Sequence, residues 1–326
     1  EGDRITLQPG DHTMLDLINA NRGKKAAAVE VKPDDRAIFM YTGGSTGVSK
    51  GAVLLHRNLV ANALQTKAWF TAFTEGKEVI LAVLPFFHSF GLTTCLNLAL
   101  TNGCKLVMLP RFVLNDVLKT IDKQKPTLFP GVPTMYVAIN NAPDLHKYDI
   151  KSIKVCVSGA APLPVEVQQT FEKNTGGKLV EGYGLSETSP VTHCNPIFGK
   201  RVPGSIGLPF PDVDIKIVDV ETGEKELPIG EVGELCIKGP QVMEGYLNMP
   251  EENANSMRDG WFYTGDIARV DEEGYTYIVD RKKDMVIAGG YNIYPRDIEE
   301  VLYTHPKIME ATVAGIRDPY RGETLK

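Results

Sequence analysis

The fold is decided by the stretch Tyr41-Thr42-Gly43-Gly44-Ser45-Thr46-Gly47-Val48-Ser49-Lys50-Gly51. Apolar runs at 37–40 and 52–55 flank it, so the sequence predicts a strand, a loop and a second strand. Glycine lets backbone N–H groups approach an anion closely, hydroxyl groups add hydrogen-bond donors, and lysine supplies a positive charge. The stretch is therefore a candidate phosphate-binding loop.

Two other kinds of loop share part of this pattern. A Walker A loop needs Gly before its lysine and Ser or Thr after it, whereas Ser49 precedes Lys50 and Gly51 follows it. A glycine-rich hairpin that binds nothing would have the same composition. The loop alone does not decide between this plain hairpin and a phosphate site.

The order of residues in the loop resembles the phosphate loop of the adenylate-forming superfamily, which includes acyl-CoA synthetases, luciferases and the adenylation domains of peptide synthetases. Gly43 stands where many members have Ser or Thr, a form common among long-chain fatty acid–CoA ligases. Ser49 replaces the usual proline and loosens the loop, because proline restricts the backbone more. The resemblance implies a catalytic Lys50, a magnesium ligand at Thr42, and an ATP- or AMP-binding set of Thr42, Gly43, Gly44, Ser45, Thr46 and Gly47.

Composition narrows the class of protein. The 326 residues carry a net charge of −6, which argues against a general nucleic-acid binder. The scattered cysteines lack any Cys-x-x-Cys spacing and are typical of core residues in a reducing compartment. No apolar run approaches the roughly 18 residues of a membrane span. We expect a cytoplasmic protein, and the sequence leaves open both peripheral contact with a membrane and the oligomeric state.

The pattern of apolar runs predicts an α/β fold with two regions that differ in their secondary structure. Up to about residue 200, strand-like and helix-like stretches alternate, which predicts mainly parallel sheets covered by helices, with ligands at the carboxyl ends of the strands. The strands are expected at 37–41, 79–84, 105–109, 127–129 and 153–157. The helices are expected at 14–21, 58–70, 92–100, 114–123 and 165–174.

The alternation stops after about residue 202. Short strands at 213–218, 233–238, 267–270 and 275–279, separated by turn residues, predict a small antiparallel β-barrel or sheet. We therefore expect an α/β domain at 1–200, an antiparallel β subdomain at 201–280, and a hinge with the start of an α+β C-terminal domain at 281–326. The resemblance implies that the first subdomain of the large N-terminal domain is largely missing and that the C-terminal domain is truncated.

A histidine among phenylalanines follows the strand expected at 79–84, in Phe86-Phe87-His88-Ser89-Phe90. Such a residue could simply cap backbone groups. In the superfamily this segment lies beside the acyl pocket, and acyl-CoA synthetases often have this histidine, whereas peptide synthetases place an aspartate nearby for a substrate amine. His88 therefore favours a simple carboxylic acid, and the resemblance places it among the catalytic residues.

Two further segments resemble nucleotide-binding motifs. The first is the run of small residues Gly159-Ala160-Ala161, which follows the strand expected at 153–157. Small residues let the backbone pack against a planar ligand, although an ordinary strand-to-helix turn has the same pattern. The resemblance places Gly159, Ala160 and Ala161 at the adenine and acyl pocket. The stretch 181–188 offers an aromatic ring and oxygen ligands, which suit a base and a hard cation. The resemblance implies an ATP site at Glu181, Gly182, Tyr183 (stacked on adenine) and Ser186 (at phosphate), with Glu187 as catalytic residue and magnesium ligand.

The last matching segments lie beyond residue 260. Asp266, in Gly260-Trp261-Phe262-Tyr263-Thr264-Gly265-Asp266, would usually be a turn residue, but in the family its counterpart holds the ribose hydroxyls. Residues 280–284 form a charged cluster that is either a solvated edge or a linker. By resemblance this is the family's hinge, with Arg281 at ribose, Lys283 as pivot, and Gly289 and Gly290 lining the approach of coenzyme A.

Together these segments imply ATP- and Mg²⁺-dependent activation of a fatty acid to acyl-AMP, followed by transfer to coenzyme A. The alternatives are an acyl-AMP ligase that serves a carrier protein, a ligase for aryl or medium-chain acids, a peptide synthetase adenylation domain, and a nucleotide-binding module without catalysis. The family's catalytic lysine of the C-terminal domain has no recognisable counterpart after Lys283, so we expect the chain as given to be an incomplete enzyme.

Overall fold

The computed structural model describes residues 6–42, 49–71, 73–288, 291–303, 305, 307–308, 311–318 and 321–326. Contacts between residues divide the chain into two units, 1–32 and 33–326. In the first unit, helix α1 (Met14–Asn21) begins after Thr13, whose hydroxyl oxygen accepts a hydrogen bond from the Asp16 amide at 3.1 Å. The prediction of this helix is confirmed.

A mixed sheet forms the α/β part of the second unit. Strands β3 (Val79–Ala82) and β4 (Lys105–Met108) are parallel, as are β5 (Val155–Ser158) and β6 (Lys178–Gly184). Leu128 joins the two pairs through parallel bridges to β3 and β5. Strands β7 (Val191–Cys194) and β8 (Leu208–Pro209) extend the sheet in antiparallel fashion. The expected strand at 127–129 is thus reduced to single bridges.

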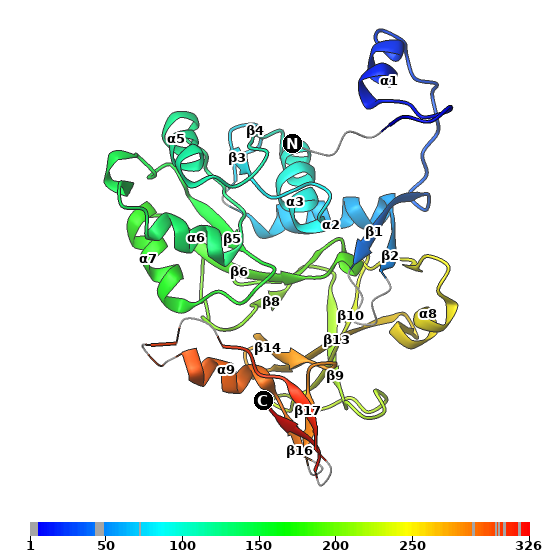
Figure 1. The fold of residues 1–326 in the computed structure, drawn as a ribbon, viewed down its shortest axis with the longest axis vertical. Helices are drawn as coiled ribbons and strands as arrows, with labels where there is room; N and C mark the ends of the chain where they lie inside the picture. Colours follow the sequence, from blue (N-terminus) through cyan, green and yellow to red (C-terminus); the bar gives the residue numbers. More distant parts are fainter. Residues whose placement is uncertain are drawn as a thin grey trace. The chain divides into compact units, whose positions relative to one another are not determined.

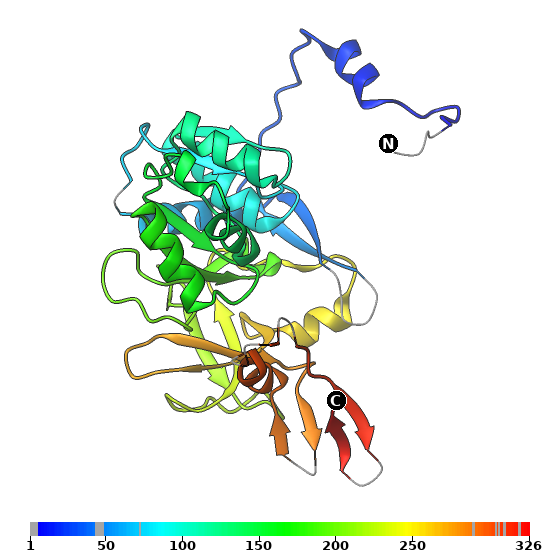
Figure 2. The same ribbon diagram turned by 60° about the vertical axis from the view of Figure 1, so that its left-hand side comes forward.

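Both faces of this sheet are buried, because alternate residues of each strand enter different cores. Val155 and Val157 pack into one core, and Cys156 between them packs into the other. The second core includes residues of α5, α6 and α7, which cover the same side of β5 and β6 in Figures 1 and 2. The helical segments are α2 (His56–Trp69), α3 (Ser89–Gly91), the π-helix η1 (Leu92–Asn97), α4 (Leu98–Asn102), α5 (Leu114–Gln124), α6 (Pro133–Asn140), and α7 (Val165–Thr175), with short 3-10 turns η2 (Leu145–Lys147) and η3 (Ser186–Thr188).

The strands on either side of the predicted phosphate loop do not belong to a parallel sheet. Strands β1 (Arg36–Thr42) and β2 (Lys50–Leu55) form an antiparallel pair, and β11 (Gly245–Tyr246) adds to β2. The prediction of mainly parallel sheets is therefore wrong here, since a loop of this length can join adjacent antiparallel strands directly. The loop residues 43–48 lie outside the described residues, so the structure places only its two ends, Thr42 and Lys50.

The region after residue 202 contains an antiparallel sheet. Its strands run in the order β12-β13-β10-β9, and β14 also pairs with β13. They are β9 (Asp214–Val218), β10 (Gly233–Lys238), β12 (Met257–Arg258), β13 (Trp261–Val270) and β14 (Thr276–Arg281), with helix α8 (Pro250–Ser256) before β12. No sheet within the described residues is closed, so the expected barrel is not confirmed, whereas the antiparallel sheet is observed.

A glycine joins this sheet to the mixed one. The Gly207 carbonyl accepts a hydrogen bond from the Thr276 amide at 3.0 Å, and the Ile206 amide donates to the Thr276 carbonyl at 2.9 Å. Gly207 has φ of +92°, and a Cβ atom there would lie 2.1 Å from the backbone carbonyl carbon of Cys194. Only glycine therefore fits this junction between β7 and β14.

The C-terminal strands form another antiparallel sheet, in the order β16-β15-β18-β17. Its elements are β15 (Val286–Ala288), β16 (Tyr291–Ile293), α9 (Pro295–Tyr303), β17 (Gly315–Asp318) and β18 (Gly322–Leu325). Asp280, on β14, accepts hydrogen bonds from the Arg281 amide at 2.7 Å and the Arg296 amide at 3.1 Å. The Arg296 guanidinium also donates to the Ile278 carbonyl at 3.1 Å, so α9 is tied to β14. In the described part of the chain, no helix has the length and apolar character needed to cross a membrane.

Candidate active site

A cavity of about 1140 Å³ lies where strands β5 and β6 end, between the mixed sheet, the β1–β2 hairpin and the antiparallel sheet. Its position agrees with the rule that ligands bind at the carboxyl ends of parallel strands. The candidate site residues that line it are Thr42, Lys50, His88, Gly159, Ala160, Ala161, Glu181, Gly182, Tyr183, Ser186, Glu187, Asp266, Arg281 and Lys283. Gly43, Gly44, Ser45, Thr46, Gly47, Gly289 and Gly290 lie outside the described residues.

Glu187 presents one carboxylate oxygen to a tyrosine. It lies on the short turn η3 after β6 and is 8% exposed. The Tyr246 hydroxyl donates to Glu187 Oε1 at 2.8 Å, while Oε2 has no hydrogen-bond partner in the part of the chain that the structure describes. Burial, followed by the charge of Glu187, raises the pKa of the Tyr246 hydroxyl. Tyr246 therefore stays protonated and remains a hydrogen-bond donor.

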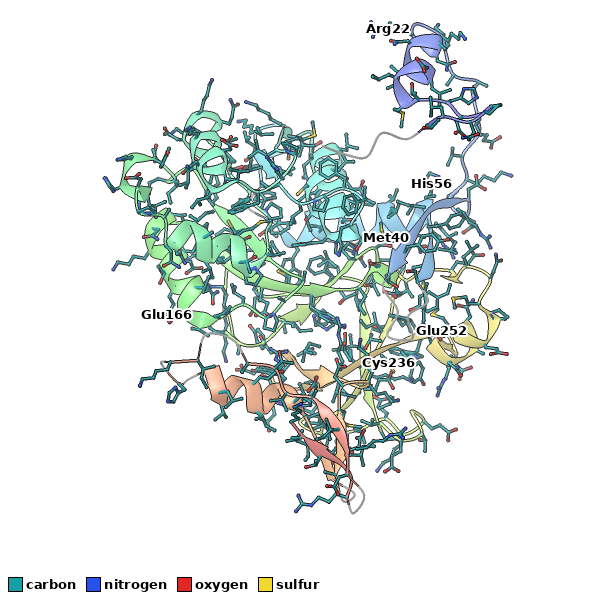
Figure 3. All side chains as sticks on the ribbon, in the orientation of Figure 1. Arg22, Met40, His56, Glu166, Cys236 and Glu252 are labelled. Atoms are coloured by element: carbon teal, nitrogen blue, oxygen red, sulfur yellow. The ribbon has the colours of Figure 1, made fainter. Side chains whose placement is uncertain are left out.

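Lys50 is held by a carboxylate and lies over the ring of the same tyrosine. Its ammonium group forms an ion pair with Glu252, on α8, and lies 5.4 Å from the centroid of the Tyr246 ring. Figure 3 labels Glu252 on this helix. Both side chains of the pair are at most one-third exposed, so the charges are only partly screened by water. An anion with more charge than one carboxylate could compete with Glu252 for Lys50.

The donor set near Glu187 fits magnesium that arrives with phosphate groups. Magnesium in nucleotide sites usually keeps waters and binds one or two carboxylates plus phosphate oxygens. Glu187 offers Oε2, which has no partner among the described residues, and Thr42 offers a hydroxyl whose contact with the Lys50 carbonyl is long, at 3.4 Å. Among the described residues there is no cluster of three or more His, Cys, Asp or Glu side chains that would hold a metal ion by itself.

Asp266 and Tyr183 are joined across the cavity wall. The Tyr183 hydroxyl donates to Asp266 Oδ2, and Arg281 Nε lies 3.7 Å from Oδ1. The contact between Asp266 and Arg281 follows from strand pairing, because Asp266 of β13 lies opposite Arg281 of β14. Burial raises the pKa of the Asp266 carboxyl, although the Tyr183 hydrogen bond and Arg281 partly oppose this. Burial and the neighbouring Asp266 also raise the pKa of Tyr183.

We expect Asp266→Asn to raise the free energy of unfolding at neutral pH by about 0.5 to 2 kcal/mol, since the variant no longer buries a carboxylate. The raised pKa means that the folded protein binds this proton more tightly than the unfolded chain does, so the carboxylate destabilises the fold above its folded-state pKa. The gain should shrink as the pH falls through that pKa and vanish below the usual value of 3.8, where Asp266 is neutral in both states. Urea unfolding of both proteins over a pH series measures this. A gain that does not change with pH would contradict the assignment.

The wall near His88 is built from close packing. His88 Nδ1 accepts a hydrogen bond from the Phe90 amide at 3.2 Å, so the histidine does cap α3. A Cβ atom on Gly159 would lie 3.1 Å from the Phe90 ring. The Ser89 and Ser186 hydroxyl oxygens are 3.4 Å apart, which places the loop after β3 beside η3.

Several residues at the cavity were missed from the sequence. Tyr246 and Glu252 contact Glu187 and Lys50, and the Lys282 ammonium contacts Glu234 Oε2 at 2.7 Å. Pro250 followed by two glutamates is a good signal for the start of α8. No signal in the sequence shows that this helix reaches Lys50, because the contact joins residues about two hundred positions apart.

Comparison with known proteins identifies a family and similar relatives. A family model described as AMP-binding enzyme matches residues 4–247. The chain is 53% identical, over 316 residues, to a long-chain-fatty-acid–CoA ligase of Bacillus subtilis (strain 168). This match covers 97% of the chain and 56% of the relative, so the chain spans little more than half of that protein's length.

Solved structures of similar proteins have the same fold as this chain. The ATP-bound MatB from Rhodopseudomonas palustris superposes with a TM-score of 0.86 at 35% identity, over 95% of this chain and 61% of that one. An o-succinylbenzoate coenzyme A synthetase from Bacillus subtilis, in complex with ATP and magnesium ion, gives a TM-score of 0.80 at 32% identity, over 93% and 62%. The α/β fold with mixed sheets is thus shared with enzymes that were crystallised with nucleotide.

Proposed function

Since this chain belongs to the AMP-binding enzyme family, we propose that it is the nucleotide- and acyl-binding part of a long-chain fatty acid–CoA ligase. The reaction is ATP-dependent conversion of a fatty acid to acyl-AMP with release of pyrophosphate, followed by transfer of the acyl group to coenzyme A. The observation that carries this proposal is that residues from motifs far apart in the sequence line one cavity. The similarity to a long-chain-fatty-acid–CoA ligase supports the choice of substrate.

The adenylation step joins two anions. A carboxylate oxygen of the fatty acid attacks the α-phosphorus of ATP, the bond from that phosphorus to the bridging oxygen breaks, and pyrophosphate leaves. Electrostatic repulsion therefore dominates the barrier, and fixed positive charges and N–H donors are the natural catalysts. Lys50 would supply the charge after exchanging Glu252 for phosphate, and backbone N–H groups of residues 43–47 would add donors. Magnesium held by Glu187 and Thr42 would neutralise phosphate charge when bound.

The nucleoside would occupy the opposite part of the cavity. Tyr183 offers a ring face for adenine, beside the backbone of Gly159 to Ala161 and the polar groups of Glu181 and Gly182. Asp266 and Arg281 would bind the ribose hydroxyls, for which a carboxylate is a good acceptor. Because Tyr183 already donates to one oxygen of Asp266, the other oxygen would be the one offered to ribose.

The C-terminal region would take part in the second half-reaction. In this proposal residues 1–200 and 201–280 form the α/β and antiparallel parts of the large domain, and 281–326 begins the mobile domain that pivots at Lys283. Coenzyme A would approach along Gly289 and Gly290. The location would be cytoplasmic, with membrane contact limited to the surface, as suits an enzyme that takes up fatty acids.

The experiment is ATP–pyrophosphate exchange by the full-length protein with a series of straight-chain acids. The apolar wall of Phe90 and Gly159 predicts that affinity rises with length by up to about fourfold per methylene, the equivalent of about 0.8 kcal/mol, until the pocket is full. Half-saturating concentrations across the series measure this, and aryl and amino acids serve as controls. If any of these controls outperforms every fatty acid, the substrate assignment is wrong.

The same assay separates the alternatives. ATP binding without exchange for any acid would indicate a nucleotide-binding module without catalysis. Exchange with fatty acids but no thioester with coenzyme A would indicate an acyl-AMP ligase that serves a carrier protein. Thioester formation, followed by mass spectrometry of the acyl-CoA product, would support the ligase.

A further inference from the structure

Tyr246 contacts both charged groups on the phosphate side of the cavity. Its hydroxyl donates to Glu187 Oε1 at 2.8 Å, and its ring lies 5.4 Å from the Lys50 ammonium. The side chain is 8% exposed, so water competes little for either contact. One tyrosine thus holds the anion by its polar end and the cation by its face.

The backbone of Tyr246 is fixed as firmly as its side chain. Asn253, on α8, accepts a hydrogen bond from the Tyr246 amide at 2.6 Å and donates to the Tyr246 carbonyl at 2.9 Å. Strand β11 is also paired with β2, opposite Ala52. The next residue back on α8 is Glu252, the ion-pair partner of Lys50. Helix α8 therefore sets the positions of both Tyr246 and Lys50.

The consequence concerns how Glu187 is oriented. The last torsion of a glutamate is soft, so a carboxylate without a partner samples many orientations. The Tyr246 hydroxyl engages one oxygen and leaves Oε2 without a partner among the described residues that line the cavity. Lys50 is meanwhile occupied by Glu252, so the two oppositely charged groups of the site do not pair with each other.

We propose that Tyr246 is a positioning residue for metal-bound nucleotide: its hydroxyl fixes the carboxylate of Glu187 so that the free oxygen meets the magnesium of MgATP. The inference rests on the proposed function of the site, which assigns Glu187 to the metal. Partners that orient a metal ligand typically change metal affinity by about 10- to 100-fold when removed. The effect should therefore appear in magnesium dependence and not in the binding of nucleotide without metal.

The test uses Tyr246→Phe in the full-length protein, which removes the hydroxyl and keeps the ring under Lys50. Calorimetry measures ATP binding over a magnesium series, and AMP binding without magnesium in the same samples. The magnesium concentration for half-maximal ATP binding should rise about 10-fold or more, with AMP affinity within about twofold of the parent. The matched control is Tyr275→Phe, which removes another buried tyrosine hydroxyl, one that donates to the Lys200 carbonyl away from the cavity.

A second variant separates positioning from a general loss of structure. Because Tyr246 acts through Glu187, adding Tyr246→Phe to Glu187→Gln should leave the magnesium dependence of Glu187→Gln unchanged. Additive effects, equal losses of AMP and MgATP binding, or an unchanged magnesium series for Tyr246→Phe would each overturn the proposal. Should Tyr246→Phe fail to fold, 3-fluorotyrosine placed at position 246 keeps the hydroxyl. Its ¹⁹F resonance should then shift on adding magnesium to the ATP complex, and no shift would overturn the proposal.

These outcomes are distinct from failure of the proposed function. A parent protein without fatty-acid-dependent exchange would contradict the function, whatever Tyr246→Phe does. A parent that exchanges normally beside a Tyr246→Phe variant with unchanged magnesium dependence would contradict only the role of Tyr246.

Discussion

Glu187→Ala in the full-length protein is expected to lower the rate of ATP–pyrophosphate exchange by about 10²- to 10³-fold. The carboxylate is buried, lines the cavity and keeps one oxygen available within the described part of the chain. Losing one group that stabilises charge in a transition state costs about 3 to 4 kcal/mol, which corresponds to this loss of rate. Exchange rates at saturating ATP and fatty acid measure it, so that weaker binding alone does not account for the result.

The matched control is Glu172→Ala. Glu172 is a partly buried carboxylate that forms an ion pair with Arg201, but it lies on α7 and does not line the cavity. We expect this variant to lose some stability and to keep exchange within about twofold of the parent at a temperature where both are folded. An exchange rate for Glu187→Ala equal to that of Glu172→Ala would remove Glu187 from the catalytic set.

Gly207→Ala is expected to lower the free energy of unfolding by about 3 to 5 kcal/mol. The left-handed backbone accounts for about 1 to 2 kcal/mol of this. The remainder comes from the new methyl group, which would meet the Cys194 backbone at 2.1 Å and push β7 away from the junction with β14. Urea unfolding at equilibrium measures the change.

Gly204→Ala isolates the contribution of the clash. Gly204 has nearly the same backbone angle, with φ of +84° against +92°, but a Cβ atom there would meet no atom within 4 Å. We expect this variant to lose only about 1 to 2 kcal/mol, the part due to the backbone. Equal losses for the two glycines would show that the junction relaxes around the methyl group.

Much of the fold could be predicted where local pattern and final packing agree. The expected helices at 114–123 and 165–174 are observed as Leu114–Gln124 and Val165–Thr175, and the expected strand at 233–238 is observed exactly. These segments have a clear apolar period that the tertiary structure buries, as Val117 and Ile121 of α5 show. Several candidate site residues also meet at one cavity, because strand ends in such sheets converge.

The features of the fold and the site that were not predicted depend on contacts between distant parts of the chain. Helix α6 was not predicted, although it begins at Pro133 and buries Tyr136 and Ile139. The direction of β1 was wrong because apolar runs do not say which neighbour a strand chooses. Tyr246 was missed because its partner, Glu187, lies 59 positions away and the tyrosine itself belongs to no pattern.

The hydrogen bonds of Asp280 and Arg296 bear on the rotation about Lys283 that the proposed function includes. The Asp280 carboxylate ties β14 to the first turn of α9 through the Arg296 amide, and the bond from the Arg296 guanidinium to the Ile278 carbonyl adds to this contact. A rotation that carried α9 away would break the contacts of Arg296, and losses of roughly 1 to 2 kcal/mol for each such bond multiply to about a 100-fold bias. If the proposed rotation occurs, this arrangement would then be the favoured state before any substrate arrives. In the proposed function, a ligand that turned the C-terminal segment would have to favour the rotated state by at least that ratio, so these hydrogen bonds would affect the second half-reaction as well as the affinity for coenzyme A.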